Sequence, residues 1–424
     1  MERFAIETLK KWKEKPRRKP LIVEGARQVG KTWLVKEFAR QCYKDIAYIN
    51  FENQKHLQSL FTTDFDLNRI MLAIQTETGI TCKPGKTLLF LDEIQEADNG
   101  LTVLKYFQEN APEQHVIAAG SLLGIELHKK ESFPVGKVEF LKLHPFCFKE
   151  FLLAVNESGL YNLLQSKDWT LIKTFRNKYI ERLRQYYYIG GMPEAVSAFA
   201  EGADFNEVRD IQDGILNSYD NDFSKHAPND MVPRIKQLWN SIPAQLSREN
   251  RKFIYGLIKE GARAREYELA MMWLRDCGLI HLVNCVKVPK YPLKAYEDLS
   301  AFKLFILDVG LLAAMNDVDA KVMLKGNSIF TEFKGALTEQ YVLQQLITNH
   351  TPYYWSKTNS QAEIDFLIQH EDGIIPIEVK AEENLRAKSL RQFVTEYKPR
   401  TAIRTSMSDY REEEWMTNIP LYAI

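Results

Sequence analysis

Eight residues near the start of the chain have the types and spacing of a phosphate-binding loop. Residues 25–32 place glycines at Gly25 and Gly30 and follow them with Lys31 and Thr32, between an apolar run and a segment with helical spacing. Glycines let a backbone wrap closely around phosphate oxygens, and a helix N-terminus turns free N–H groups toward negative charge. Lys31 would reach the β- and γ-phosphates, and the Thr32 hydroxyl would ligate Mg²⁺. The predicted nucleotide-binding residues are Gly25, Ala26, Arg27, Gln28, Val29, Gly30, Lys31 and Thr32.

Two carboxylates at the end of an apolar run strengthen this prediction. Residues 88–91 are all apolar, as in a strand buried on both faces of a parallel sheet, and Asp92 and Glu93 follow them. Ligands bind at the carboxyl ends of such strands. Asp92 would therefore hold Mg²⁺ through water, and Glu93 would orient or deprotonate the attacking water. A further strand ends at Ser121, which we expect to sense the γ-phosphate, although a Gly-Ser pair after a strand also occurs in simple turns.

The segments that must position these residues alternate between strand and helix. Apolar runs predict strands at 21–24, 46–51, 88–92 and 116–120, with a further strand near 138–143. Alternation of this kind predicts an α/β fold with a parallel sheet covered by helices. Between about 147 and 200 we expect a pair of helices.

Composition excludes some classes of protein. The 424 residues contain 56 basic and 56 acidic residues, so net charge favours neither nucleic acid nor any other partner, and a basic surface must be local. The five cysteines have no C-x-x-C spacing, which is typical of reduced residues in the cytoplasm. The N-terminus does not look like a signal peptide, and no apolar run reaches the roughly 18 residues that a membrane span needs.

Five stretches together resemble the AAA-type ATPases common in bacteria and archaea, which carry a C-terminal domain of unknown function. The stretches are 25–32, 88–95, 120–121, 143–146 and 190–194. The resemblance implies that the nucleotide is ATP, that Lys31, Glu93 and Ser121 are catalytic, and that residues 1–204 form an AAA-type core with a helical lid. In that family a Gly-Arg pair precedes the His-Pro motif. Here Gly136 and Lys137 stand there, and lysine lacks the planar fork of arginine, so the arginine finger is not identified.

The middle of the chain, residues 205–320, predicts connecting helices followed by a winged helix. Residues 264–277 have the apolar spacing of an amphipathic helix, and strands at 280–288 and 303–307 would form the wing. The second strand comes after a basic loop that contains Lys287, Lys290 and Lys294. We expect these lysines to contact DNA phosphates, unless they are an ordinary solvated surface.

The last segment, residues 321–424, resembles the restriction-endonuclease-like superfamily. The signature of that superfamily is an acid, a second acid that closes a strand, and Glu-x-Lys on the next strand. It matches Glu339, Asp365, Glu378 and Lys380.

Strand alternation predicts how these acids meet. A turn at residues 370–373 would pair Gln369 with Ile374, which sets Asp365 opposite Glu378 on one face of the hairpin. Two carboxylates in that position repel each other unless a cation lies between them, so we expect Mg²⁺ there. The alternative is a retained fold in which these charges pair with one another or bind a partner.

These observations predict a cytoplasmic, Mg²⁺-dependent ATPase that couples ATP to the binding of DNA or of a protein partner, with a nuclease site left open. An ATP-dependent signalling or toxin–antitoxin switch with an inactive nuclease-like domain is the alternative. A homo-oligomer is compatible with both.

Overall fold

The computed structural model describes residues 1–121, 134–248, 252–325, 331–357, 362–371, 373–383 and 387–424. The chain forms two compact units. The N-terminal unit comprises Glu2–His144 together with Asp276–Gly278, and the C-terminal unit comprises nearly all of Pro145–Ile424. Among the described residues, no helix is both long and apolar enough to cross a membrane.

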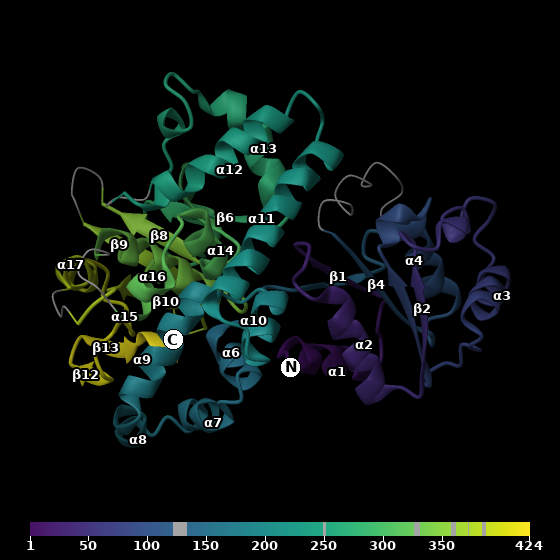
Figure 1. The fold of residues 1–424 in the computed structure, drawn as a ribbon, viewed down its shortest axis with the longest axis horizontal. Coiled ribbons are helices and arrows are strands. Elements are labelled where there is room, and N and C mark those ends of the chain that lie inside the picture. Colours follow the sequence, from purple (N-terminus) through teal and green to yellow (C-terminus); the bar gives the residue numbers. More distant parts are fainter. Residues whose placement is uncertain (122–133, 249–251, 326–330, 358–361, 372, 384–386) are drawn as a thin grey trace. The chain divides into compact units, whose positions relative to one another are not determined.

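The N-terminal unit is built on a parallel sheet of five strands in the order β2-β3-β4-β1-β5 (Figure 1). The strands are β1 (Leu21–Gly25), β2 (Asp45–Asn50), β3 (Thr87–Asp92), β4 (His115–Ser121) and β5 (Glu139–Lys142). Every residue of β3 and β4 is buried, as strands covered on both faces must be. The sheet confirms the predicted α/β fold of the P-loop type.

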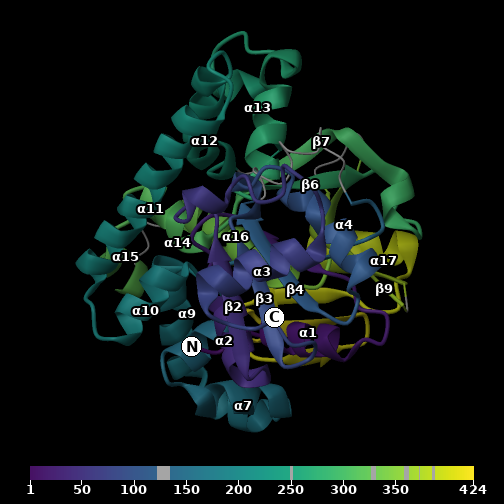
Figure 2. The ribbon, with the colours of Figure 1, turned by 90° about the vertical axis from the view of Figure 1, so that its right-hand side faces the viewer.

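Helices cover both faces of this sheet (Figure 2). They are α1 (Ala5–Glu14), α2 (Lys31–Cys42), α3 (Leu67–Thr78) and α4 (Gly100–Asn110). Helix α2 begins directly after Gly30, whose φ of 90° is a left-handed conformation that glycine adopts without strain. Helices α3 and α4 pack against one face through a cluster that includes Ile70, Leu104 and Leu89. The buried sheet therefore holds the loop after β1 and the acids after β3 at the same edge.

The C-terminal unit begins with five helices where the sequence pattern predicts two. They are α6 (Phe148–Ala154), α7 (Ser158–Ser166), α8 (Trp169–Thr174), α9 (Arg176–Ile189) and α10 (Pro193–Ala200). Residues with positive φ interrupt the helical pattern at Asn156, Lys167 and Gly190. Left-handed positions end helices, and only the glycine among these three is an obvious breaker in sequence. For that reason the prediction of two helices was wrong.

Further helices follow in the middle of the chain. They are α11 (Phe205–His226), α12 (Val232–Leu246), α13 (Ala264–Asp276), α14 (Val309–Met315) and α15 (Ala320–Lys325). Helix α13 buries Tyr267, Ala270, Met271 and Leu274, which confirms the amphipathic helix expected here.

A mixed sheet of eight strands completes this unit, in the order β12-β13-β11-β10-β9-β8-β6-β7. The strands are β6 (Ile280–Val286), β7 (Glu297–Ile306), β8 (Tyr353–Ser356), β9 (Glu363–His370), β10 (Gly373–Val379), β11 (Ile403–Ser406), β12 (Arg411–Glu413) and β13 (Met416–Pro420). Helix α16 (Thr331–Leu346) contacts β10. Helix α17 (Lys388–Tyr397) packs Phe393 against Trp355.

The hairpin that the sequence assigned to a wing is part of this larger sheet. β6 pairs antiparallel with β7 on one side and parallel with β8 on the other. Helices α12 and α13 do precede the hairpin, but residues 280–306 and 353–420 share one sheet. The winged helix, the nuclease-like domain and the boundaries at 204 and 320 stay predictions.

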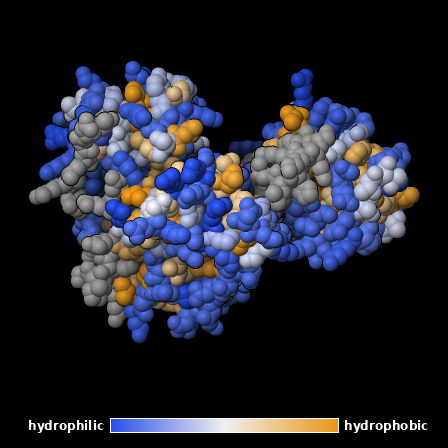
Figure 3. All heavy atoms as spheres, turned by 90° about the horizontal axis from the view of Figure 1, so that it is seen from above, coloured by the Kyte–Doolittle hydropathy of each residue, from blue (hydrophilic) through white to orange (hydrophobic). Residues whose placement is uncertain are grey.

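The face of each unit seen in Figure 3 is mainly hydrophilic, with hydrophobic residues scattered over it. Large apolar side chains that do reach solvent include Leu269 on α13 and Leu299 on β7, which are 63% and 75% exposed. Single exposed apolar residues are common on protein surfaces and indicate no binding site by themselves.

Candidate functional site

The loop after β1 places its lysine inside the N-terminal unit. Lys31 is 8% exposed, and its Nζ donates to the carbonyl oxygens of Gly25 and Ala26 at 3.1 and 2.9 Å. A Cβ on Gly25 would lie 2.5 Å from the carbonyl oxygen of Leu143, so only glycine fits there. Burial lowers the pKa of Lys31 to about 8. Two neutral carbonyls are weak partners for a buried ammonium, and a phosphate would be a stronger one.

The predicted metal ligands lie against each other. The Thr32 hydroxyl donates to Asp92 Oδ2 at 2.8 Å, and the Tyr48 hydroxyl donates to the same oxygen at 3.1 Å. The backbone N–H of Glu93 donates to the other oxygen, Asp92 Oδ1, at 3.2 Å. Burial raises the pKa of Tyr48 to about 12, so this phenol remains a neutral donor. The three donors hold the Asp92 carboxylate in one orientation beside Thr32.

Glu93 directly follows β3 and has an unusual backbone conformation. Its φ of 49° and ψ of 48° are left-handed, an uncommon conformation for a glutamate and one that clusters at functional sites. Gln95 Nε2 donates to Glu93 Oε2 at 2.6 Å. Burial raises the pKa of Glu93 above its ordinary value, which suits a carboxylate that accepts a proton from water.

Ser121 ends β4, which lies between β1 and β3 in the sheet. In the register of β1 and β4, Ser121 is opposite Gly25, the first residue of the loop. The sheet order therefore places Ser121 between the loop that would hold phosphates and the strand that carries Asp92. This is the position that a γ-phosphate sensor requires, and the role stays a prediction.

Lys137, which stands where the family has an arginine, has a partner inside its own unit. Its Nζ lies 2.9 Å from Glu109 Oε1 on α4, and the preceding Gly136 makes the turn with a φ of 71°. Nothing in this contact favours a role as an arginine finger.

These residues fit Mg-ATP by their donor set. A hydroxyl and a carboxylate in contact are hard oxygen ligands that suit Mg²⁺, which is bound by one or two such groups plus phosphates and water. A buried ammonium lies at the N-terminus of α2, where free N–H groups favour phosphate. Lys31 would hold phosphate oxygens, and Thr32 and Asp92 would hold the metal.

The four predicted C-terminal residues also come together. The register of β9 and β10 pairs Gln369 with Ile374 and Phe366 with Ile377, as predicted, and one further step sets Asp365 opposite Glu378. Asp372, part of the predicted turn, lies outside the described residues.

Side-chain contacts agree with that register. The backbone N–H of Val379 donates to Asp365 Oδ2 at 2.8 Å, and Lys380 Nζ lies 2.8 Å from Glu378 Oε1. Glu378 and Glu339 are 4% and 3% exposed. Burial and the neighbouring Glu339 raise the pKa of Asp365 well above its ordinary value.

A lysine that the sequence analysis did not single out lies among these acids. Lys303, on β7, is fully buried, and its Nζ lies 2.6 Å from Glu363 Oε1, 3.5 Å from Glu339 Oε2 and 3.8 Å from Asp365 Oδ1. Burial alone would lower the pKa of Lys303, but these carboxylates hold it above its ordinary value. We call the group the charged centre. Its members are Lys303, Glu339, Glu363, Asp365, Glu378 and Lys380.

The charged centre does not have the arrangement of a metal site. Among the described residues, no group of three or more His, Cys, Asp or Glu side chains is placed to hold a metal ion. The cation that its acids contact is the ammonium of Lys303. The predicted Mg²⁺ site at Glu339, Asp365 and Glu378 therefore remains a prediction that this geometry does not favour.

Two of the three loop lysines predicted to meet DNA have no ion pair with a described residue. Lys287 lies 3.0 Å from Asp298 Oδ2, which offsets its charge, whereas Lys290 and Lys294 are exposed.

Three residues of these two groups were not predicted from the sequence, namely Tyr48, Gln95 and Lys303. Tyr48 stands two residues before the end of its strand, and Gln95 follows Glu93 by two. Lys303 is a single charge between apolar residues, in Phe302-Lys303-Leu304. A lone charge in a buried strand requires a partner, and that requirement was the signal available.

Comparison with protein families agrees with the fold. Residues 17–152 match a family described as an AAA domain, and two families described as domains of unknown function match residues 180–322 (DUF8612) and 334–424 (DUF4143). Residues 17–152 are therefore an AAA domain with the P-loop fold, and the matches that follow it along the chain are to domains of unknown function. No curated protein matches it.

Solved structures resemble the chain only distantly. The Walker-type ATPase paby2304 of Pyrococcus abyssi is 14% identical, with 74% of this chain and 94% of that chain covered and a TM-score of 0.44. The Aeropyrum pernix Orc1 protein in complex with DNA is 11% identical, with 74% and 90% covered and a TM-score of 0.27. Drosophila ORC bound to DNA is 15% identical, with 74% and 94% covered and a TM-score of 0.26. At these values the likenesses carry no argument about function.

Proposed function

We propose that the N-terminal unit binds Mg-ATP and hydrolyses it. The contact of Thr32 with Asp92 carries this proposal, together with the left-handed conformation of the adjacent Glu93. Lys31 would leave its carbonyl partners for the β- and γ-phosphates, Ser121 would sense the γ-phosphate, and Glu93 would take a proton from the attacking water. When bound, Mg²⁺ supplies charge stabilisation for the phosphoryl group.

Three substitutions test the site. Lys31→Ala removes the cation that would face the phosphates, so ATP binding should weaken strongly. Glu93→Gln keeps the shape of the side chain and leaves Asp92 intact, so ATP should bind and stay unhydrolysed. Glu96→Gln makes the same change at an exposed position three residues later, and it should keep the wild-type turnover. Wild-type turnover in Glu93→Gln would contradict the assignment of Glu93.

We further propose that the ATP cycle controls the binding of DNA or of a protein partner by the C-terminal unit. The backbone N–H of Leu143 donates to Glu24, beside the P-loop, at 2.8 Å. Three residues later, the backbone N–H of Phe146 donates to Gly191 in the C-terminal unit at 2.7 Å. A short stretch of chain thus joins a residue fixed beside the nucleotide site to one fixed in the other unit.

Between the two roles predicted for the charged centre, its internal ion pairs favour binding over cleavage. The experiment that separates them measures ATP turnover with and without duplex DNA, next to a nuclease assay in Mg²⁺ and Mn²⁺. ATP turnover that changes when DNA is added, without cleavage of that DNA, supports a protein whose ATP cycle controls binding. Cleavage that Asp365→Asn abolishes would instead support a nuclease. The cytoplasm, where the five free cysteines would stay reduced, remains the expected compartment, and a second copy of the chain remains a candidate partner.

A further inference from the structure

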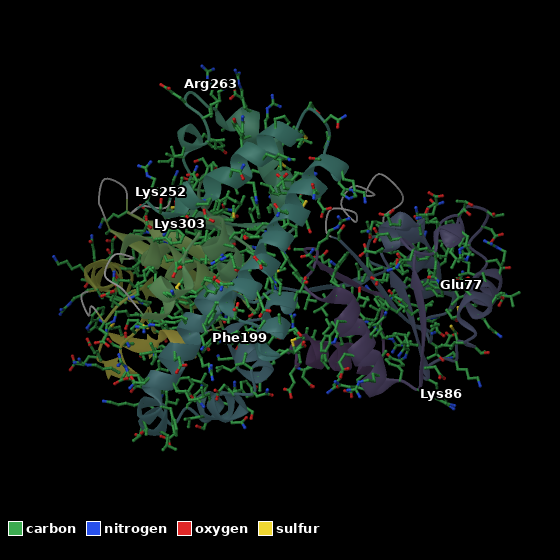
Figure 4. All side chains as sticks on the ribbon, in the orientation of Figure 1. Glu77, Lys86, Phe199, Lys252, Arg263 and Lys303 are labelled. Carbon is green, nitrogen blue, oxygen red and sulfur yellow. The ribbon has the colours of Figure 1, made fainter. Side chains whose placement is uncertain are left out.

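Lys303 reaches the charged centre from a strand that the sequence assigned to a different domain. β7 lies at one edge of the eight-stranded sheet, whereas Asp365 and Glu378 lie on β9 and β10. Figure 4 shows Lys303 within the C-terminal unit, close to Lys252, and a backbone bridge joins these two residues. The Lys303 side chain is fully buried, and its ammonium also lies 5.2 Å from the ring centre of Tyr354. Lys303 is therefore held both by its backbone pairing and by the groups around its ammonium.

The distances around this ammonium are those of ion pairs. Its Nζ lies between 2.6 and 3.8 Å from oxygens of Glu363, Glu339 and Asp365. Mg²⁺ would need oxygens at about 2.0–2.1 Å and Ca²⁺ at about 2.3–2.6 Å. Because the lysine nitrogen fills the space between the three carboxylates, a metal ion could reach those distances only if Lys303 moved away.

Most of the negative charge of the centre is offset without a metal, since three cations of the chain oppose four acids. Lys303 and Lys380 are two cations beside these acids. Arg404 lies opposite Glu378 in the register of β10 and β11 and is a third cation. Lys303 and Arg404 are buried, and Lys380 is half-buried. The four acids are Glu339, Glu363, Asp365 and Glu378. A buried carboxylate needs a partner of opposite charge, and here the chain supplies that partner itself.

One acceptor in the centre remains unused. Glu378 Oε2 is buried and has no hydrogen-bond partner among the described residues. If the ammonium of Lys303 were removed, Glu339, Glu363 and Asp365 would lose the cation that they share, and Lys380 would remain as the partner of Glu378 Oε1.

We propose that the ammonium of Lys303 is a built-in counter-ion that takes the place of a divalent metal in the charged centre. The wild-type centre then binds no metal ion. Replacing Lys303 by a neutral side chain of similar shape converts it into a site for one divalent cation with oxygen ligands. The proposal goes beyond ATP hydrolysis and does not depend on it, because its test uses no nucleotide.

The test measures Mn²⁺ binding by electron paramagnetic resonance on the full, nucleotide-free chain. The variant K303M removes the charge and keeps the length of the side chain. K303R keeps the charge. K252M is the matched control, because Lys252 lies beside Lys303 in the backbone but its Nζ contacts the Ser356 hydroxyl, at 3.0 Å, and no carboxylate of the described residues. Every variant retains the same P-loop, so Mn²⁺ bound there contributes equally to all of them.

We expect K303M to bind one more Mn²⁺ per chain than the wild type, K303R and K252M, and the K303M/D365N double variant to lose that ion. K303M should also gain thermal stability from Mn²⁺ that the wild type does not gain, because the ion replaces the missing charge. A folded K303M that binds no additional Mn²⁺ would overturn the proposal.

The comparison of wild type with Asp365→Asn decides the question if K303M does not fold. Equal Mn²⁺ binding by these two proteins supports a centre without metal. A Mn²⁺ ion that the wild type binds and Asp365→Asn loses shows a native metal site, and the proposal is then wrong.

Discussion

Lys31 shows how burial sets the chemistry of a single residue. A free lysine has a pKa near 10.5, whereas burial brings that of Lys31 to about 8, although the charges of Glu93 and Asp92 act in the opposite direction. Phosphate favours the charged form of the lysine, so nucleotide binding must raise this pKa again. Binding and protonation of Lys31 are therefore linked.

This linkage gives ATP binding a defined pH dependence. Below pH 8, Lys31 is already charged in the nucleotide-free site. Its protonation should therefore cause little change of affinity with pH in that range. Above pH 8 the free lysine is neutral and must take up a proton, so the dissociation constant should rise, by at most about tenfold per pH unit. Calorimetric titration at pH 7 and pH 9, in buffers of different ionisation enthalpy, measures both the affinity and the proton uptake. The same affinity at both pH values, with no proton uptake, would contradict the linkage.

Gln95 acts on Glu93 through one hydrogen bond, which makes it a positioning residue. A hydrogen bond to a charged group contributes about 1.5–3 kcal/mol, equivalent to roughly one to two pKa units. Gln95→Leu should therefore raise the pKa of Glu93 further, since the donated bond stabilises the ionised carboxylate. We expect the acidic limb of the pH–kcat profile to move upward by about that amount, with ATP affinity unchanged. A uniform loss of turnover at every pH would indicate a merely structural role.

At the scale of elements, the Asp308 carboxylate connects the ends of helices in the C-terminal unit. Asp308 begins α14 and accepts hydrogen bonds from the backbone N–H groups of Gly191, Gly310 and Leu311, at 2.6, 2.9 and 3.1 Å. Gln344, on α16, donates to the same carboxylate at 2.9 Å. The motif at residues 190–194, between α9 and α10, is thus joined to α14 and α16, which gives a structural role to a stretch that the candidate nucleotide site does not use.

Two glycine substitutions test this junction. Gly190 has a φ of 76°, and a Cβ there would lie 2.0 Å from Asp308 Oδ1, so Gly190→Ala should destabilise the C-terminal unit by more than about 2 kcal/mol. Gly214, exposed within α11, has no atom within 4 Å of an added Cβ, so Gly214→Ala should stabilise by roughly 0.5–1 kcal/mol. Calorimetric unfolding of the full chain compares the two variants. A neutral Gly190→Ala would show that the junction rearranges freely.

At the scale of the whole molecule, the chain carries equal numbers of basic and acidic residues, 56 of each, so any contact with DNA must be local. Lys290 and Lys294 are exposed, whereas Lys287 is paired with Asp298. The contribution of the loop to phosphate binding should therefore come mainly from Lys290 and Lys294.

Salt dependence tests that contact. If the loop binds DNA, the triple variant of Lys287, Lys290 and Lys294 to Ala should weaken affinity for all sequences alike. The slope of log K against log salt should fall by about two, because each phosphate contact contributes roughly 0.9. The control variant replaces Lys83 and Lys86, exposed lysines of the N-terminal unit, and should keep the slope. An unchanged slope in the triple variant would place the contact elsewhere or remove DNA from the function.

The sequence by itself determined the local geometry of the candidate nucleotide site and the hairpin register. Local chemistry is sufficient for both. Gly25 to Thr32 run from the end of β1 through a turn into the start of α2, and the two-residue alternation of β9 and β10 sets Asp365 opposite Glu378. Only the tertiary structure decided which cation faces those acids. Lys303 precedes Asp365 by 62 residues (365 minus 303) and reaches it through the sheet that β6 and β7 share with β8 and β9. Strand order in a sheet depends on long-range packing, which residue spacing along the chain does not encode, so neither the shared sheet nor its buried lysine could be predicted.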